Sequence, residues 1–89
     1  MVLVEFTPNL EKHLRCPTLQ VEGSNLRDIL LQCCRLNPPL RSYLLDDQNR
    51  VRKHIAIFID GVIFSDRERQ TDAVKADSRV FVAQALSGG

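Results

Sequence analysis

The 89-residue sequence has only three cysteines and almost no net charge, and each of these features excludes a class of protein. Its three cysteines are an odd number without Cys-x-x-Cys spacing, so neither a disulfide framework nor a metal site is expected. Twelve Lys and Arg residues against eleven Asp and Glu leave a net charge of +1. Because nucleic-acid-binding domains carry a marked basic excess that neutralises phosphates, we expect no nucleic-acid partner.

Long hydrophobic runs are also missing. No stretch approaches the roughly 20 apolar residues that a membrane helix needs, and residues 1–6 lack the features of a signal peptide. Glycine-rich phosphate loops, paired-carboxylate sites and Ser/His/Asp sets are not visible either. We therefore expect a cytoplasmic domain without a membrane partner. A chain this short has little room for a deep catalytic cleft, so it is expected to bind or be acted upon rather than to be an enzyme.

The first half of the chain has the pattern of two strands followed by one helix. Apolar residues alternate over residues 2–6 and again over 18–22, which predicts two paired strands joined by a long loop. Ser24 is a good N-cap for the helix that follows. Apolar residues then recur at helical spacing on one face: Leu26, Ile29, Leu30, Cys33 and Leu36. The helix is predicted to end at Asn37-Pro38-Pro39, because proline cannot continue it.

The second half is predicted to consist mainly of strands. Tyr43-Leu44-Leu45 indicates a short extended piece, and the very hydrophobic run 55–59 indicates a buried strand. Asp60-Gly61, between two apolar runs, is a strong hairpin signal. Residues 65–78 are polar and irregular, and 80–86 form the last strand. A single helix covers only one face of a sheet, so the predicted class is α+β, with one main helix across a mixed sheet of four to five strands.

Two clusters suggest chemistry, but the pattern favours a structural interpretation of each. Cys33 lies on the apolar stripe of the helix and Cys34 on its flank, so we interpret both as small buried hydrophobes. A basic cluster occurs further along the chain: Arg50, Arg52, Lys53 and His54. We interpret it as a solvated strand edge, where charge discourages aggregation. Docking to an acidic partner surface is the alternative.

The sequence ends on Ser87-Gly88-Gly89, directly after the last predicted strand. At the usual glycine frequency of about 7%, two glycines at a chain end arise by chance in roughly 0.5% of cases. Glycine lacks Cβ and adopts unusual backbone angles freely, so such a tail can thread a narrow channel. We predict a domain over residues 1–86 and a flexible tail over 87–89. The alternative is a frayed chain end without function.

The order of elements resembles that of the ThiS/MoaD sulfur carriers, as do the Asp60-Gly61 hairpin after Ile57-Phe58-Ile59 and the last strand leading into Ser87-Gly88-Gly89. The resemblance implies a ubiquitin-like β-grasp fold and a co-substrate rather than an enzyme. It also implies that a ThiF/MoeB-like activating enzyme, using its own ATP and Mg²⁺, adenylates the carboxylate of Gly89. The resulting thiocarboxylate would donate sulfur to a synthase, of which the chain could be the small subunit. No cofactor would be bound by the chain itself.

Partner docking needs a surface beside the tail. Alternate residues of a strand face opposite sides of a sheet, so we predict that Val80 and Val82 are buried by the helix. Phe81 and Ala83 would then form an exposed apolar patch that binds partners, with Ser87 leading into the tail. The alternative is that Phe81 belongs to the core.

Other functions remain open on the sequence alone. A ubiquitin-like protein modifier would also activate Gly89 but would transfer it to a lysine amine. A binding module would use its sheet surface and would not need Gly89. Within the carrier interpretation the sulfur acceptor is also open: thiamine thiazole, the molybdenum-cofactor dithiolene, a cysteine-type amino acid or another thiolated metabolite.

Overall fold

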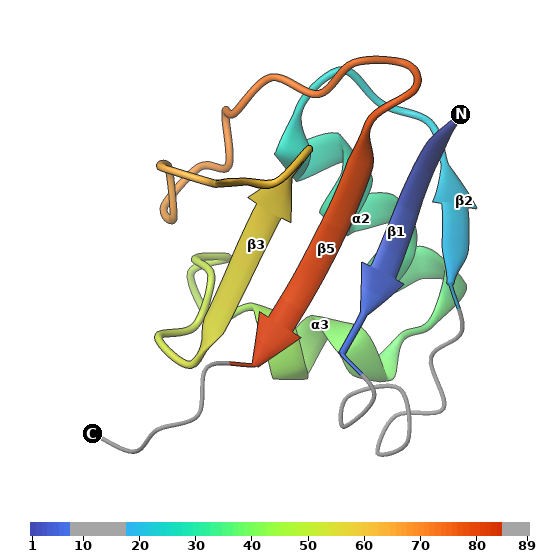
Figure 1. The fold of residues 1–89 in the computed structure, drawn as a ribbon. Helices are drawn as coiled ribbons and strands as arrows, with labels where there is room; N and C mark the ends of the chain where they lie inside the picture. Colours follow the sequence, from blue (N-terminus) through green and yellow to red (C-terminus); the bar gives the residue numbers. More distant parts are fainter. Residues whose placement is uncertain (8–17, 85–89) are drawn as a thin grey trace.

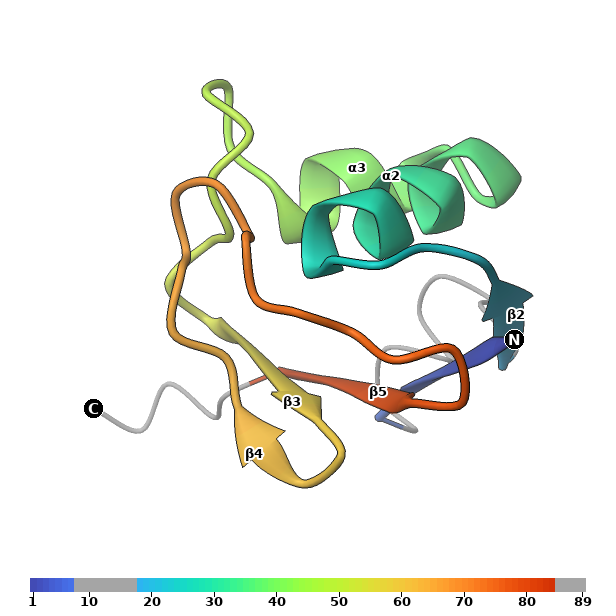
Figure 2. The ribbon, with the colours of Figure 1, turned by 90° about the horizontal axis from the view of Figure 1, so that it is seen from above.

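The computed structural model describes residues 1–7 and 18–84. Five strands form one mixed sheet, and two helices pack on one side of it (Figures 1 and 2). In chain order the elements are β1 (Val2–Phe6), β2 (Leu19–Val21), α2 (Leu26–Leu36), α3 (Pro39–Leu44), β3 (Ile55–Ile59), β4 (Val62–Ile63) and β5 (Arg79–Gln84). The predicted α+β class, with one main helix on a mixed sheet, is confirmed. No helix of the described part is long and apolar enough to cross a membrane.

Strand β5 lies at the centre of the sheet, whose order is β2-β1-β5-β3-β4. It runs parallel to β1 and antiparallel to β3. At its middle, Val80 is paired with Val4 on one side and with Ile59 on the other. The last described residues of the chain therefore lie in the interior of the sheet and not at an edge (Figure 1).

The core lies between the sheet and the helices. Alternate residues of the three inner strands point towards the helices and are buried: Val2, Val4, Phe6, Ile55, Ile57, Val80 and Val82. Helix α2 buries Leu26, Ile29, Leu30 and Cys33 of its predicted stripe against them, and Cys34 is buried too, as expected. The prediction was wrong for Leu36, which lies at the end of the helix and is 61% exposed. Each such side chain contributes about 1.5–3 kcal/mol when it is removed from water. Neither helix of the described ranges covers the outer face of the sheet (Figure 2).

The N-cap of helix α2 is Asn25, so the prediction of Ser24 was wrong. Asn25 has an extended backbone, and its side-chain oxygen accepts a hydrogen bond from the backbone N–H of Asp28 at 2.9 Å. The backbone carbonyl of Ser24 instead accepts from the N–H of Val74 at 3.0 Å. Asn25 also forms a β-bridge with Ala73. Two neighbouring residues were both good caps, and their contacts with a distant segment determined which one is used.

The extended piece predicted at Tyr43-Leu44-Leu45 is also wrong, because residues 39–44 form the short helix α3. Pro39 lies in its first turn, where the missing N–H is not needed and the fixed φ angle suits a helix. Leu40 and Leu44, four residues apart, are both fully buried. The prolines therefore end one helix and begin the next.

The hairpin predicted at Asp60-Gly61 is confirmed between β3 and β4. Asp60 has a φ of 51° and Gly61 a φ of 85°, as a type I′ turn requires. The Asp60 carboxylate also accepts hydrogen bonds from the N–H of Arg79 at 2.9 Å and from the hydroxyl of Ser78 at 2.7 Å. These bonds lower the pKa of Asp60, with the Arg79 N–H as the largest cause. The turn is thus tied to the first residue of β5.

Replacing Gly61 with alanine should destabilise the fold by about 1 kcal/mol, because an alanine is strained at this positive φ. A Cβ at this position meets no heavy atom within 4 Å, so the cost comes from the backbone alone. Gly61→Asn is the control, since asparagine tolerates the left-handed conformation and should cost less. Urea unfolding measures both variants. Equal stability of the alanine variant and the unsubstituted chain would contradict the turn described here.

Candidate functional site

The candidate site is the end of strand β5, beyond which the predicted reactive tail follows. The N–H of Thr7 donates to the carbonyl of Val82 at 3.1 Å, and Gln84 is paired with Ile55 of β3. Strand β5 is therefore held from both sides close to its last described residue. Ser87, Gly88 and Gly89, for which we predicted the chemistry, lie outside the described residues.

An apolar row crosses the open face of the sheet through Phe81, three residues before the end of β5. Phe81 is paired with Phe58, and Phe58 with Ile63, so three neighbouring strands contribute. Phe81 is 40% exposed and Ile63 is 55% exposed, while Phe58 is half-buried. Ala83 lies in the next row, paired with Ala56, and both are half-buried. Phe81 is thus exposed and not part of the core, whereas Phe58 and Ile63 were missed because only the strand register brings them beside it.

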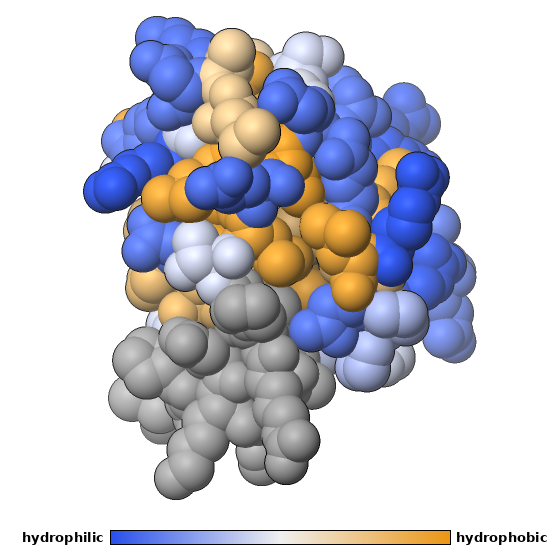
Figure 3. Space-filling model, turned by 90° about the vertical axis from the view of Figure 1, so that its right-hand side faces the viewer, coloured by the Kyte–Doolittle hydropathy of each residue, from blue (hydrophilic) through white to orange (hydrophobic). Residues whose placement is uncertain are grey.

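The apolar row (Phe81, Phe58 and Ile63) does not continue across the whole sheet. On the β1 side Phe81 is paired with Glu5, and Arg79 with Leu3. The carboxylate of Glu5 therefore borders the row on β1, Arg79 lies two residues before Phe81 on β5 itself, and the row extends towards β4. A separate group of hydrophobic side chains lies on the β2 side of the molecule (Figure 3). We assign the candidate site to the apolar row because it shares strand β5 with the tail.

Three side chains connect the end of β5 to helix α3. The Tyr43 hydroxyl donates a hydrogen bond of 2.8 Å to Oε1 of Gln84. The Tyr43 ring also packs edge-on against His54, with 5.5 Å between the ring centroids. We call Tyr43, His54 and Gln84 the clasp. It was missed in the sequence because Tyr43 was expected to lie in an extended piece, 41 residues away from its partner.

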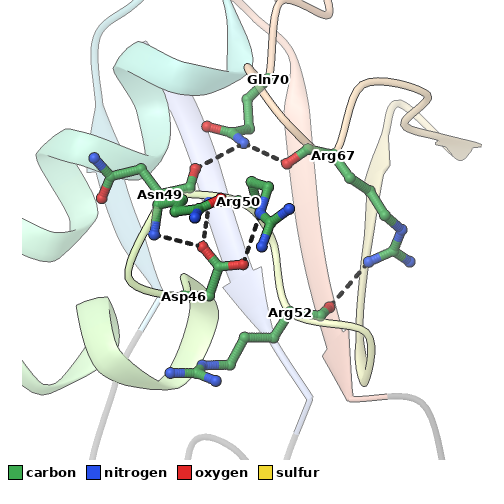
Figure 4. Close-up of polar contacts among 7 residues, drawn as sticks. Asp46, Asn49, Arg50, Arg52, Arg67 and Gln70 are labelled. Carbon is green, nitrogen blue, oxygen red and sulfur yellow. Dashed lines mark hydrogen bonds and ion pairs between the residues drawn. The ribbon is translucent and has the colours of Figure 1, made fainter.

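The basic cluster at residues 50–54 lies in the loop between α3 and β3, so its interpretation as a strand edge was wrong. Asp46 holds the start of this loop by accepting from the N–H groups of Gln48 and Arg50, and it forms an ion pair with Arg50 at 3.0 Å (Figure 4). The N–H of Arg50 is the largest cause of the lowered pKa of Asp46. Asp46 is thus a turn residue that stabilises the start of the loop.

The segment over residues 65–78 is also ordered by its own polar groups. Asp66 accepts from the hydroxyl of Thr71 at 2.6 Å and from the N–H of Arg69 at 3.0 Å, and these bonds lower its pKa to about 2, with Thr71 as the largest cause. Gln70 is buried and donates to the carbonyls of Arg67 and Asn49 (Figure 4). Gln70 thus joins the two loops beside the start of β3. In the described ranges no group of three His, Cys, Asp or Glu residues is placed to hold a metal ion.

Solved structures match almost the whole chain. SAMP1 from Haloferax volcanii matches with a TM-score of 0.80 and 20% identity, over 99% of this chain and 98% of that one. Small archaeal modifier protein 1 from Methanosarcina acetivorans has a TM-score of 0.82 and 22% identity, over 99% and 95%. A chain of the BexX/CysO complex from Amycolatopsis orientalis has a TM-score of 0.82 and 16% identity, over the full length of both.

The chain has the ubiquitin-like β-grasp fold. The resemblance to small sulfur carriers drawn from the sequence is thereby confirmed at the level of the fold. No protein-family model matches the chain, and no curated protein matches its sequence. Within the β-grasp fold, the clasp lies at the point where residues beyond 84 begin, and the apolar row lies further back along β5, on its open face.

Replacing Tyr43 with phenylalanine removes only the hydroxyl of the clasp. We expect a loss of about 1 kcal/mol, the usual net contribution of one hydrogen bond, together with faster amide hydrogen exchange at residues 82–84. Ser42→Ala is the matched control, because its hydroxyl makes only an exposed 3.3 Å bond to the carbonyl of Pro39. Unchanged exchange at Gln84 in the Tyr43 variant would show that the clasp does not hold the end of β5.

Proposed function

We propose that this chain is a sulfur carrier whose C-terminal Gly89 is adenylated by a partner enzyme and then converted to a thiocarboxylate. The position of β5 carries the proposal, because this central strand is held by the β1 side as far as Val82 and by β3 as far as Gln84, shortly before the glycines. Five residues in extended form span at most about 17 Å. That length is enough for Gly89 to enter a partner's active site while the folded domain stays outside.

The chemistry starts from the α-carboxylate, which is ionised at neutral pH because its reference pKa is about 3.5. A carboxylate oxygen attacks the α-phosphorus of ATP, pyrophosphate leaves, and an acyl-adenylate forms. A sulfur nucleophile at the oxidation level of sulfide then attacks the carbonyl carbon, AMP leaves, and a thiocarboxylate remains. Gly88 and Gly89 suit this path because neither has a Cβ that would block a narrow channel.

The partner supplies everything else in this scheme. A ThiF/MoeB-like activating enzyme would provide the ATP site, the Mg²⁺ and the sulfur relay, and a synthase would accept the sulfur. The chain would work in the cytoplasm, where ATP is available, as a co-substrate or as the small subunit of that synthase. The match to a chain of the BexX/CysO complex supports partner binding by a domain of this fold.

The apolar row is the proposed docking surface for these partners. Exposed aromatic side chains are frequent anchors of protein interfaces, and Phe81 lies at the centre of the open face on the same strand as the tail. Ala83 is small and lies nearer the tail, so a partner can approach the sheet closely there. Ser87 would lead from this surface into the glycines.

A protein modifier is the second candidate, and the names of the matched small archaeal modifier proteins favour it. The first step would be the same adenylation of Gly89. The difference lies in the nucleophile, since a lysine amine in place of sulfur would displace AMP and form an isopeptide bond. A binding module that does not use Gly89 is the remaining possibility.

Intact mass spectrometry of the chain from its native cells tests the proposal and separates the candidates. We expect a species in which one oxygen is replaced by sulfur, localised to Gly89. Variants that lack Gly89 or carry one appended residue should fold normally but lose adenylation, because the reacting group moves and the core does not. Isopeptide-linked adducts would indicate a modifier. Normal adenylation of both variants would contradict the carrier proposal.

Replacing Phe81 with aspartate should weaken binding to the activating enzyme by at least about tenfold, because a charge would be placed in a desolvated contact. Thermal stability should change little, since Phe81 is outside the core. Leu31→Asp is the matched control, because Leu31 on helix α2 is also 40% exposed. Binding is measured by titration calorimetry. Equal affinities of the two variants would show that the row is not the docking surface.

A further inference from the structure

A groove with a basic lining opens beside the clasp. Residues 50–54 form one wall of it, and Arg67 and Glu68 contribute to the other. Four cations line this basic groove, against the two carboxylates of Asp46 and Glu68: Arg50, Arg52, Lys53 and Arg67. Neither the fold nor the proposed carboxylate chemistry accounts for this concentration of positive charge.

Most of these cations are not neutralised within the chain. Arg50 makes the one ion pair of the described residues, with Asp46. Nε of Arg52 donates instead to the carbonyl of Ser42 at 2.8 Å. Nη1 of Arg67 donates to the carbonyl of Arg52 at 2.9 Å (Figure 4). A carbonyl is neutral, so these bonds orient the guanidinium groups without cancelling their charge. Lys53 is exposed and has no ion-pair partner in the described part of the chain.

Arg67 is held by a second contact as well, because its guanidinium lies 5.0 Å from the centre of the Phe64 ring. A guanidinium fixed in this way keeps further N–H donors and loses little side-chain freedom when it binds a carboxylate. The groove therefore presents the oriented guanidinium groups of Arg52 and Arg67 together with the exposed ammonium of Lys53. This arrangement suits an anionic side chain better than an apolar one.

The groove lies next to the point where the tail begins. His54, which lines it, contacts Tyr43, and Tyr43 holds Gln84. Ile55, the next residue after His54, is itself paired with Gln84 across the sheet. A partner that binds residues beyond 84 therefore comes within reach of the groove.

We propose that the basic groove binds an acidic segment of the activating enzyme, with Asp or Glu side chains facing Arg52, Lys53 and Arg67. This inference rests on the proposed function. The groove is open to solvent, so it does not enclose most of a small molecule, as small-molecule sites do. The net charge of +1 gives little attraction for a nucleic acid. A short carboxylate-bearing protein segment fits both observations.

The test compares the adenylation kinetics of charge variants with the activating enzyme that adenylates the chain. Lys53→Glu should lower kcat/KM about tenfold at about 0.05 M salt, mainly through association. The deficit should shrink at about 0.5 M salt, where exposed charges are screened within a few ångströms. Lys53→Arg should keep the normal value. Lys75→Glu is the matched control, because Lys75 is exposed, carries the same charge and does not line the groove.

Each outcome decides between the two ideas. If the unsubstituted chain is adenylated and Lys53→Glu behaves like Lys75→Glu, the groove does not bind the enzyme, although the carrier function stands. If the unsubstituted chain is not adenylated at all, the proposed function fails and this inference fails with it. A fluorescent single-stranded oligonucleotide is tested as a competing ligand. If it binds at physiological salt and Lys53→Glu abolishes that binding, the ligand of the groove is a nucleic acid and the proposal of an acidic protein segment is wrong.

Discussion

The pairing of β5 on both of its sides is the constraint on which the rest of the structure depends. This strand joins the N-terminal pair of strands, through β1, to the pair formed by β3 and β4. Because side chains alternate along it, the register that buries Val80 and Val82 also places Phe81 on the open face. A shift of one residue would exchange the core residues for those of the proposed docking surface. One set of backbone hydrogen bonds therefore determines both.

Polar contacts at the two ends of β5 stabilise the register of this strand with its neighbours. At its start the Asp60 carboxylate binds Ser78 and Arg79, and at its end the Tyr43 hydroxyl binds Gln84. The loop before β5 is held less directly, since the first N–H groups of helix α2 donate to the carbonyls of Asp72 and Gln70. The first backbone N–H groups of a helix have no partner within the helix. Those of α2 therefore hold the segment before β5, which forms no strand or helix of its own.

The sequence predicted those parts of the fold that depend on near neighbours. Alternation along β1, β3 and β5, the helical stripe of α2 and the Asp60-Gly61 turn all follow from contacts within a few residues. The parts that it missed depend on distant ones. Three apolar residues at 43–45 carry no periodicity, and only the burial of Leu40 with Leu44 makes that segment helical. The apolar row and the clasp likewise need the sheet register and the partner of Tyr43, which no local pattern contains.

The arrangement separates recognition from reaction. The apolar row and the basic groove belong to the folded domain, whereas the proposed reactive carboxylate lies five residues beyond Gln84. A domain bound at these surfaces holds a short tail near the partner's catalytic centre at an effective concentration in the millimolar range or above. Changes in the row or groove should therefore act on association, and changes in the tail on the chemical step. The pairing of β5 makes this separation of binding and chemistry possible. If the last strand were frayed, the start of the tail would not have a fixed position relative to the bound surfaces.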